Sequence, residues 1–162
     1  MITASLCRFL PLFLSSLHSV LPCRTAELYI EEAFTFYKSV FGGEFSGNGI
    51  MRFGDIPPSP DNPPASEDDK NLVMYVELRI LGVHTLMGTD APESMGLHVN
   101  KGNNMYINLQ LDTRKDTEKY FKALAEGGKV EMELGDMFWG DYFGSLVDKF
   151  GIPWMFNCPE KA

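Results

Sequence analysis

The sequence predicts an α+β fold made of two βαβββ modules. Two observations support this prediction. An amphipathic helix, a pair of glycines and an extended segment occur in that order twice, with the pairs Gly42–Gly43 and Gly127–Gly128 standing 85 residues apart. Runs of alternating apolar residues, typical of strands, follow the first helix and flank the second. At 162 residues the chain is long enough for one domain with a sizeable core.

The first predicted helix begins near Ile30 and ends at Phe41, before the first glycine pair. Its apolar residues recur at helical spacing. They are Ile30, Ala33, Phe34, Tyr37 and Phe41. A glycine after the last turn is typical of a helix C-terminus, because it adopts the left-handed conformation at low cost.

The second predicted helix follows Thr113, with Asp116 three residues later giving a start similar to a capping box. Its apolar residues are Tyr120, Phe121 and Leu124. It ends before the second glycine pair, as the first helix does.

The remaining apolar runs predict strands. They read EFSGNGIMRFG, NLVMYVELRIL and VHTLMGT in the first half, and NMYINLQLD, KVEMELGDMFWG, YFGSLVDKF and IPWMFN in the second. In the last run, Ile152, Trp154 and Phe156 share one face and Met155 lies on the other.

A proline-rich segment, Gly54 to Asn71, interrupts the first half with five prolines and several acidic residues. Segments of this length are uncommon inside compact domains unless they act as lids, bind partners or are disordered. We interpret it as a solvated surface excursion, with a lid as the alternative.

The first residues allow three interpretations, one of which is an incorrect gene start. Residues 1–17 form a leader, with Arg8 before a short apolar run, similar to a weak secretory signal. The run is too short to span a membrane. The alternative is that the segment around Ser19 to Arg24 forms the first strand. We take residues 18–162 as one domain, with modules at about 18–95 and 103–158.

Charge and cysteine content exclude some functions. The formal charge of −8 and the lack of a Lys/Arg cluster argue against nucleic acid as a partner. Three widely spaced cysteines form no disulfide framework, which favours a reducing compartment. No GxSxG, P-loop or correctly placed GxGxxG motif is present.

The stretch Asp136 to Asn157 holds seven of the twenty aromatic residues. Asp148 and Gly151 fit the first and fourth positions of a type I turn, so we predict a turn-forming role for Asp148 rather than a catalytic one. Gly140, after Phe138 and Trp139, marks a bend or a bulge in the strand. We expect most of these aromatic side chains in the core and at least one on a cavity wall.

Four features together resemble the PhnB-like family of the vicinal oxygen chelate superfamily, which includes glyoxalase I and the bleomycin and fosfomycin resistance proteins. They are EEAFTFYKSVFGGEF, LMGTD, the proline-rich segment, and KALAEGGKVEMELGDMFWGDYFGSLVDKFGIPWMFN. Members are sometimes labelled 3-demethylubiquinone methyltransferase-like. The resemblance covers about residues 30 to 158. It implies two βαβββ modules curved around a cavity (the glyoxalase/bleomycin resistance/dioxygenase-like fold), a homodimer, a small-molecule ligand and a cytoplasmic location, whereas the leader points to export.

The superfamily's chemistry uses a divalent metal held by His, Gln or Glu ligands. This chain has Tyr75 where the family strand often carries His, and Met155 where metal-dependent members place Glu. His18, if it lies in the first strand, and Glu77 are the remaining weak candidates. His84 and His98 match no family ligand position, and we interpret them as packing or surface residues.

Two main functional hypotheses follow. The first is a small-molecule binding protein without an intact metal site, whose apolar cavity is walled by Tyr75, Phe138, Trp139 and Trp154. The second is a divalent-metal-dependent lyase or isomerase with His18 and Glu77 among its ligands. A third, weaker hypothesis is a damaged paralogue, which predicts that Met1 to Arg24 contributes no paired strand.

Overall fold

The computed structural model describes residues 18–23, 29–59, 64–82, 84–97, 99 and 102–159. The first half contains β1 (His18–Cys23), α1 (Tyr29–Phe41), β2 (Met51–Arg52), β3 (Val73–Ile80) and β4 (His84–Asp90). The second half contains β5 (Ile107–Gln110), α2 (Arg114–Ala125), β6 (Lys129–Asp136), β7 (Asp141–Val147) and β8 (Pro153–Pro159). Two short 3₁₀ turns, η1 (Phe53–Asp55) and η2 (Glu93–Met95), lie in the first half.

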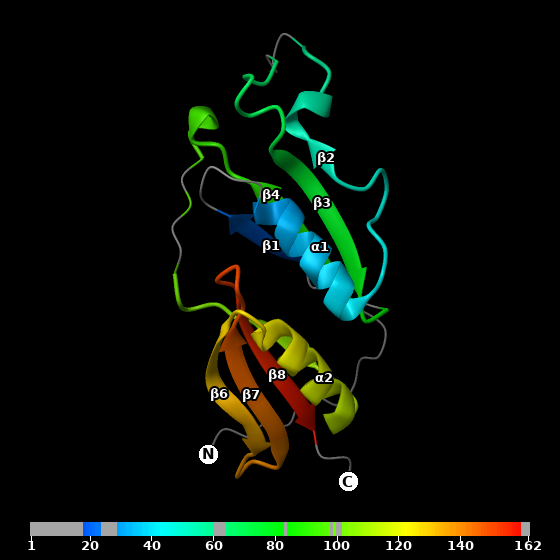
Figure 1. The fold of residues 1–162 in the computed structure, drawn as a ribbon, viewed down its shortest axis with the longest axis vertical. Coiled ribbons are helices and arrows are strands. Elements are labelled where there is room, and N and C mark those ends of the chain that lie inside the picture. Colours follow the sequence, from blue (N-terminus) through cyan, green and yellow to red (C-terminus); the bar gives the residue numbers. More distant parts are fainter. Residues whose placement is uncertain are drawn as a thin grey trace, which may run out of the picture.

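Each half folds into a curved four-stranded sheet with one helix across it, and the two halves lie end to end (Figure 1). The strand orders are β1-β4-β3-β2 and β5-β8-β7-β6. The first strand of each half pairs in parallel with the last, and the other pairs are antiparallel. The predicted α+β fold of two βαβββ modules is therefore confirmed.

Both predicted helices are confirmed, together with the signals that bound them. α2 has Thr113 as its N-cap, and the Thr113 hydroxyl accepts a hydrogen bond from the Asp116 backbone N–H at 3.1 Å. Gly42 and Gly127, which follow the helices, have φ values of 72° each. This left-handed conformation suits glycine and ends the helix.

The second glycine of each pair has a different role, which explains why the motif has two. A Cβ atom on Gly43 would lie 1.9 Å from the Arg79 carbonyl oxygen, and one on Gly128 would lie 2.5 Å from the Val147 carbonyl oxygen. Only glycine lets the chain leaving each helix pass this close to the end of the neighbouring strand.

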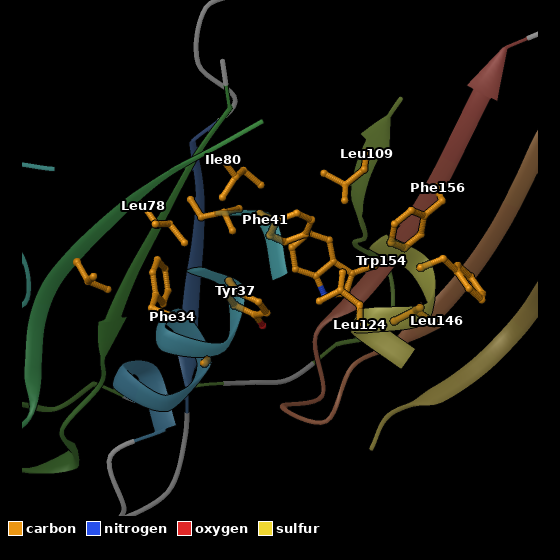
Figure 2. Close-up of a cluster of buried hydrophobic side chains, with 14 of the residues drawn as sticks. Phe34, Tyr37, Phe41, Leu78, Ile80, Leu109, Leu124, Leu146, Trp154 and Phe156 are labelled. Atoms are coloured by element: carbon orange, nitrogen blue, oxygen red, sulfur yellow. The ribbon is translucent and has the colours of Figure 1, made fainter. Parts of the chain in front are cut away.

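One hydrophobic core joins the two halves across their helices (Figure 2). Tyr37 of α1 packs edge-on against Trp154 of β8, with ring centroids 5.5 Å apart, and Phe41 lies 5.8 Å from the same indole. Aromatic contacts of this kind add to the free energy gained by burying the rings themselves.

The structure shows whether the segment around Ser19 to Arg24 forms the first strand. β1 spans His18–Cys23 and pairs in parallel with β4, so the interpretation of the segment around Ser19 to Arg24 as a strand is confirmed. The damaged-paralogue hypothesis predicted no such pairing and loses its support. The leader, residues 1–17, lies outside the described residues. In the described part of the chain, neither helix has the length and apolar character needed to cross a bilayer.

The proline-rich segment is anchored at its C-terminal end. The Asp69 side chain accepts hydrogen bonds from the hydroxyls of Ser66 (2.6 Å) and Ser94 (2.5 Å), which lower its pKa below the ordinary value. The Gly54 N–H also donates to the Lys70 carbonyl at 2.9 Å. Residues 60–63 lie outside the described residues, so the choice between surface excursion and lid stays a prediction.

Candidate functional site

A cleft of about 250 Å³ lies beside β3 in the first half. It exists because β2 is only two residues long, so a loop rather than a full edge strand borders β3 there. The cleft is lined by Ser46, Gly47, Asn48, Gly49, Met51, Tyr75 and Glu77. We call it the β3 cleft.

Two polar side chains of β3 meet in this cleft. The Tyr75 hydroxyl donates a hydrogen bond to Glu77 Oε2 at 2.6 Å, which is possible because residues two apart on a strand share a face. This hydrogen bond is the main cause that raises the pKa of Tyr75, and burial and the charge of Glu77 act in the same direction. The phenol therefore stays protonated at neutral pH and keeps its oxygen lone pairs available as acceptors.

The loop opposite β3 is fixed by its backbone. The Ser46 N–H donates to the Glu77 carbonyl at 2.9 Å, and the Gly49 N–H donates to the Ser46 carbonyl at 3.1 Å. Gly47 and Gly49 have φ values of 59° and 81°, a conformation that most other residues disfavour. Ser46 Oγ is buried and has no hydrogen-bond partner among the described residues.

A second feature stands on the other half of the molecule. The turn between β6 and β7 carries Phe138 and Trp139, which we call the aromatic tip. Phe138 is 98% exposed and Trp139 is 51% exposed. Their ring centroids lie 4.8 Å apart at 87°, and Trp139 also contacts Phe143 at 6.1 Å.

The backbone of this turn explains the exposure. The Met137 N–H donates to the Asp141 carbonyl and the Gly140 N–H donates to the Met137 carbonyl, both at 2.9 Å. Gly140 has a φ of 97°, so the predicted bend at this glycine is confirmed as a tight hairpin turn. A turn this tight leaves the two rings projecting from the end of the sheet.

Trp154, the fourth predicted wall residue, lies in the core with 0% of its surface exposed. Its Nε1–H donates to Asp148 Oδ2 at 2.9 Å, and the Tyr37 hydroxyl donates to the same oxygen at 2.7 Å. Since Tyr37 and Asp148 come from different halves, this carboxylate links the halves. The indole packs between elements and has no surface on the β3 cleft.

Asp148 itself has the predicted turn-forming role. Its Oδ1 accepts hydrogen bonds from the backbone N–H groups of Phe150 and Ile152, both at 2.9 Å. The Gly151 N–H donates to the Asp148 carbonyl at 2.9 Å and closes the turn. This set of donors accounts for a carboxylate that is only 3% exposed.

The candidate metal ligands are only partly brought together. β1, which contains His18, is separated from β3, which contains Glu77, by β4 alone. His84 begins β4 and is half-buried, whereas His98 lies outside the described residues. Within the described part of the chain, no group of three or more His, Cys, Asp or Glu side chains is arranged to hold a metal ion.

These features agree with the comparison to known families. The family model of the Glyoxalase/Bleomycin resistance protein/Dioxygenase superfamily matches residues 29–156, and the chain belongs to this superfamily. The resemblance noted from the sequence is therefore confirmed.

The chain is also similar to individual proteins over most of its length. The chain is 33% identical to protein PA1353 from Pseudomonas aeruginosa, with a TM-score of 0.67, covering 88% of this chain and 98% of that one. The PhnB protein from Bacillus cereus is 24% identical with a TM-score of 0.62, covering 87% of this chain and 97% of that one. Protein YjdN from Escherichia coli K12 is 29% identical over 137 residues, which is 80% of this chain and 88% of that protein.

The loop that forms one wall of the β3 cleft was not predicted from the sequence. The glycine-rich segment GGEFSGNG follows a helix rather than opening one, so the sequence gives it no role as a phosphate-binding loop. The usable signal was the spacing of Gly47 and Gly49, because glycines in an expected edge strand indicate an interruption.

Proposed function

We propose that this protein is a homodimeric, cytoplasmic small-molecule binding protein, whose ligand lies between the β3 cleft of one copy and the aromatic tip of the other. The β3 cleft is the observation that carries the proposal. It offers Tyr75 as a wall, together with polar groups that can orient a ligand.

The size of the cleft favours a site shared by two copies. Sites for drug-sized ligands measure about 300–1,000 Å³ and bury most of the ligand. The β3 cleft, at about 250 Å³ and open to solvent, accommodates one end of such a molecule.

The aromatic tip is suited to cover the other end. Adjacent exposed aromatic rings commonly mark ligand or protein interfaces. The β6–β7 turn lies at the end of the second half remote from β3, so the tip of the same chain is poorly placed to reach the cleft (Figure 1). A two-fold dimer would bring each tip to the partner's cleft and form the contact twice.

The test uses N-phenyl-1-naphthylamine, an apolar dye whose fluorescence rises in apolar sites. The unmodified chain should bind it saturably. Tyr75→Ala and Trp139→Ala should each reduce the affinity about tenfold or more, because aromatic anchors dominate such sites.

Tyr142→Ala is the matched control. Tyr142 neighbours Phe143 on β7 but lies on the opposite face, where its hydroxyl donates to Glu118 at 3.3 Å and Arg114 stacks on its ring. It should leave dye binding unchanged. Absence of saturable binding by the unmodified chain, or equal affinities in all three variants, would contradict the proposal.

A metal-dependent lyase or isomerase is the second candidate. It is favoured by the position of His18 in the same sheet as Glu77, two strands away. Elemental analysis of the dialysed, untagged chain separates the candidates. The binding proposal expects no stoichiometric metal, whereas near-stoichiometric Zn, Mn, Ni or Fe would favour the lyase or isomerase.

A further inference from the structure

The β3 cleft presents hydrogen-bond acceptors to its ligand. Glu77 contributes a carboxylate, and the Tyr75 oxygen can accept while its proton is donated to Glu77. Ser46 Oγ is buried at the cleft wall and has no partner among the described residues, so rotation about χ1 would be needed to turn its hydroxyl toward a ligand. A ligand with several N–H donors on one atom suits this arrangement.

The charge of the cleft points to a cation. Among the described residues that line it, one carboxylate is present and no Lys, Arg or His. The whole chain carries a formal charge of −8, which raises the local concentration of cations and repels anions.

An aromatic ring beside a carboxylate adds a second reason. The face of a tyrosine ring attracts ammonium groups, and a carboxylate forms strong charge-assisted hydrogen bonds with them. Tyr75 and Glu77 supply both, on one face of one strand and 2.6 Å apart at their polar atoms.

From these observations we propose that the β3 cleft binds the protonated amine of an organic ammonium ligand, with Glu77, Tyr75 and Ser46 as its recognition residues. The inference rests on the proposed function, since the apolar part of the ligand would extend toward the aromatic tip of the second copy. It adds the chemical class of the ligand, which the fold family leaves open.

The test compares three probes of the same length: n-butylammonium chloride, n-butanol and sodium butyrate. Each is titrated at pH 7 into the full-length ¹⁵N-labelled chain, and the amide signals of Ser46, Gly47 and Gly49 are followed by NMR. Butylammonium should shift these signals saturably, butanol should bind about tenfold more weakly or worse, and butyrate should not bind.

Single substitutions then show which residues bind butylammonium. Glu77→Gln should weaken butylammonium binding about tenfold or more, and Ser46→Ala should weaken it severalfold. Glu118→Gln is the matched control, because Glu118 also accepts a tyrosine hydroxyl hydrogen bond, from Tyr142, but outside the cleft. It should bind as the unmodified chain does, and the spectrum of each variant reports whether it is folded.

Equal shifts from all three probes, unchanged binding in Glu77→Gln, or no shift from butylammonium would each overturn the inference. The naphthylamine dye distinguishes this from failure of the proposed function. If the dye still binds through Tyr75 and Trp139, the binding protein stands and only its preference for ammonium ligands falls.

Discussion

The two halves of the molecule have the same architecture and differ at one edge. In the first half, β2 has two residues and a loop borders β3. In the second half, β6 has eight residues and borders β7. The first half consequently contains the β3 cleft, and the second half ends in a tight hairpin that carries the aromatic tip.

The registers show which positions correspond. Leu78 lies opposite Leu86 in the β3–β4 pair, as Leu146 lies opposite Trp154 in the β7–β8 pair. By the same register Glu77 corresponds to Ser145, which is buried and has Met132 of β6 as its strand partner. A shortened edge strand therefore makes a packed sheet position accessible without changing the fold around it.

The largest expected effect on stability is at Trp154, the core position that corresponds to Leu86 in the first half. Trp154→Ala should lower the free energy of unfolding by about 3–5 kcal/mol, because it removes a fully buried indole. It also removes a donor from the buried carboxylate of Asp148. Urea denaturation at one fixed chain concentration measures the change.

Leu86→Ala, at the equivalent position of the first half, should cost less. Leu86 is 3% exposed and brings no hydrogen bond to lose. Trp154 contacts the other half of the molecule. If Leu86→Ala destabilises the chain as much as Trp154→Ala does, that contact is not a principal contributor to stability.

The glycine pairs give a second matched comparison. Gly43→Ala should cost at least about 2 kcal/mol, since its Cβ would overlap the Arg79 carbonyl. Gly42→Ala should cost only about 1 kcal/mol, because its φ is unfavourable but nothing lies within 4 Å of the added Cβ. Thermal unfolding of the two variants checks the order, and equal losses would contradict distinct roles for the two glycines.

A smaller effect on stability is expected at the aromatic tip. Trp139→Ala should change the unfolding free energy by less than about 1 kcal/mol, since half of the side chain is exposed. Its main effect should be weaker ligand binding. A loss similar to that of Trp154→Ala, with binding intact in the folded variant, would assign Trp139 to the core instead.

The smallest expected effect is on the pH dependence of stability, and it involves Asp90 in the first half. Burial raises the pKa of Asp90, although its hydrogen bond from the Val73 N–H opposes the shift. A raised pKa in the folded state means that the stability from Asp90 is fully present below the ordinary value of 3.8 and is lost as pH rises through the folded-state pKa.

Asp90→Asn keeps an acceptor for Val73 and removes the buried charge. The variant should therefore gain stability relative to the unmodified chain as pH rises from about 3.5 to 7. Denaturation curves across this range measure the difference, and a constant difference would show that Asp90 has the same pKa in both states.

Much of the fold could be predicted because its signals are local. Helical spacing and glycine pairs bound α1 and α2, and alternation in IPWMFN identified the buried face of β8. Trp154 was nevertheless expected on a cavity wall, since alternation assigns a side chain to a face but does not say what covers that face. The exposure of Phe138 follows from the tightness of the β6–β7 turn, which composition does not encode.

The candidate site was harder to predict because its parts are far apart. Tyr75 and Glu77 were both singled out from one strand, and their hydrogen bond follows from their spacing. Ser46 was missed, because its place beside β3 depends on where β2 is interrupted. Whether Tyr75, Phe138 and Trp139 act in one site depends on a second copy of the chain, which stays a prediction.

One measurement tests the shared site most directly. Tyr75→Ala and Trp139→Ala chains, each deficient in naphthylamine binding, are mixed under conditions that allow subunit exchange. If the aromatic tip of one copy completes the cleft of the other, a mixed dimer regains one intact site, and an equal mixture should recover about a quarter of the original binding capacity. No recovery after confirmed subunit exchange would contradict a site shared between copies.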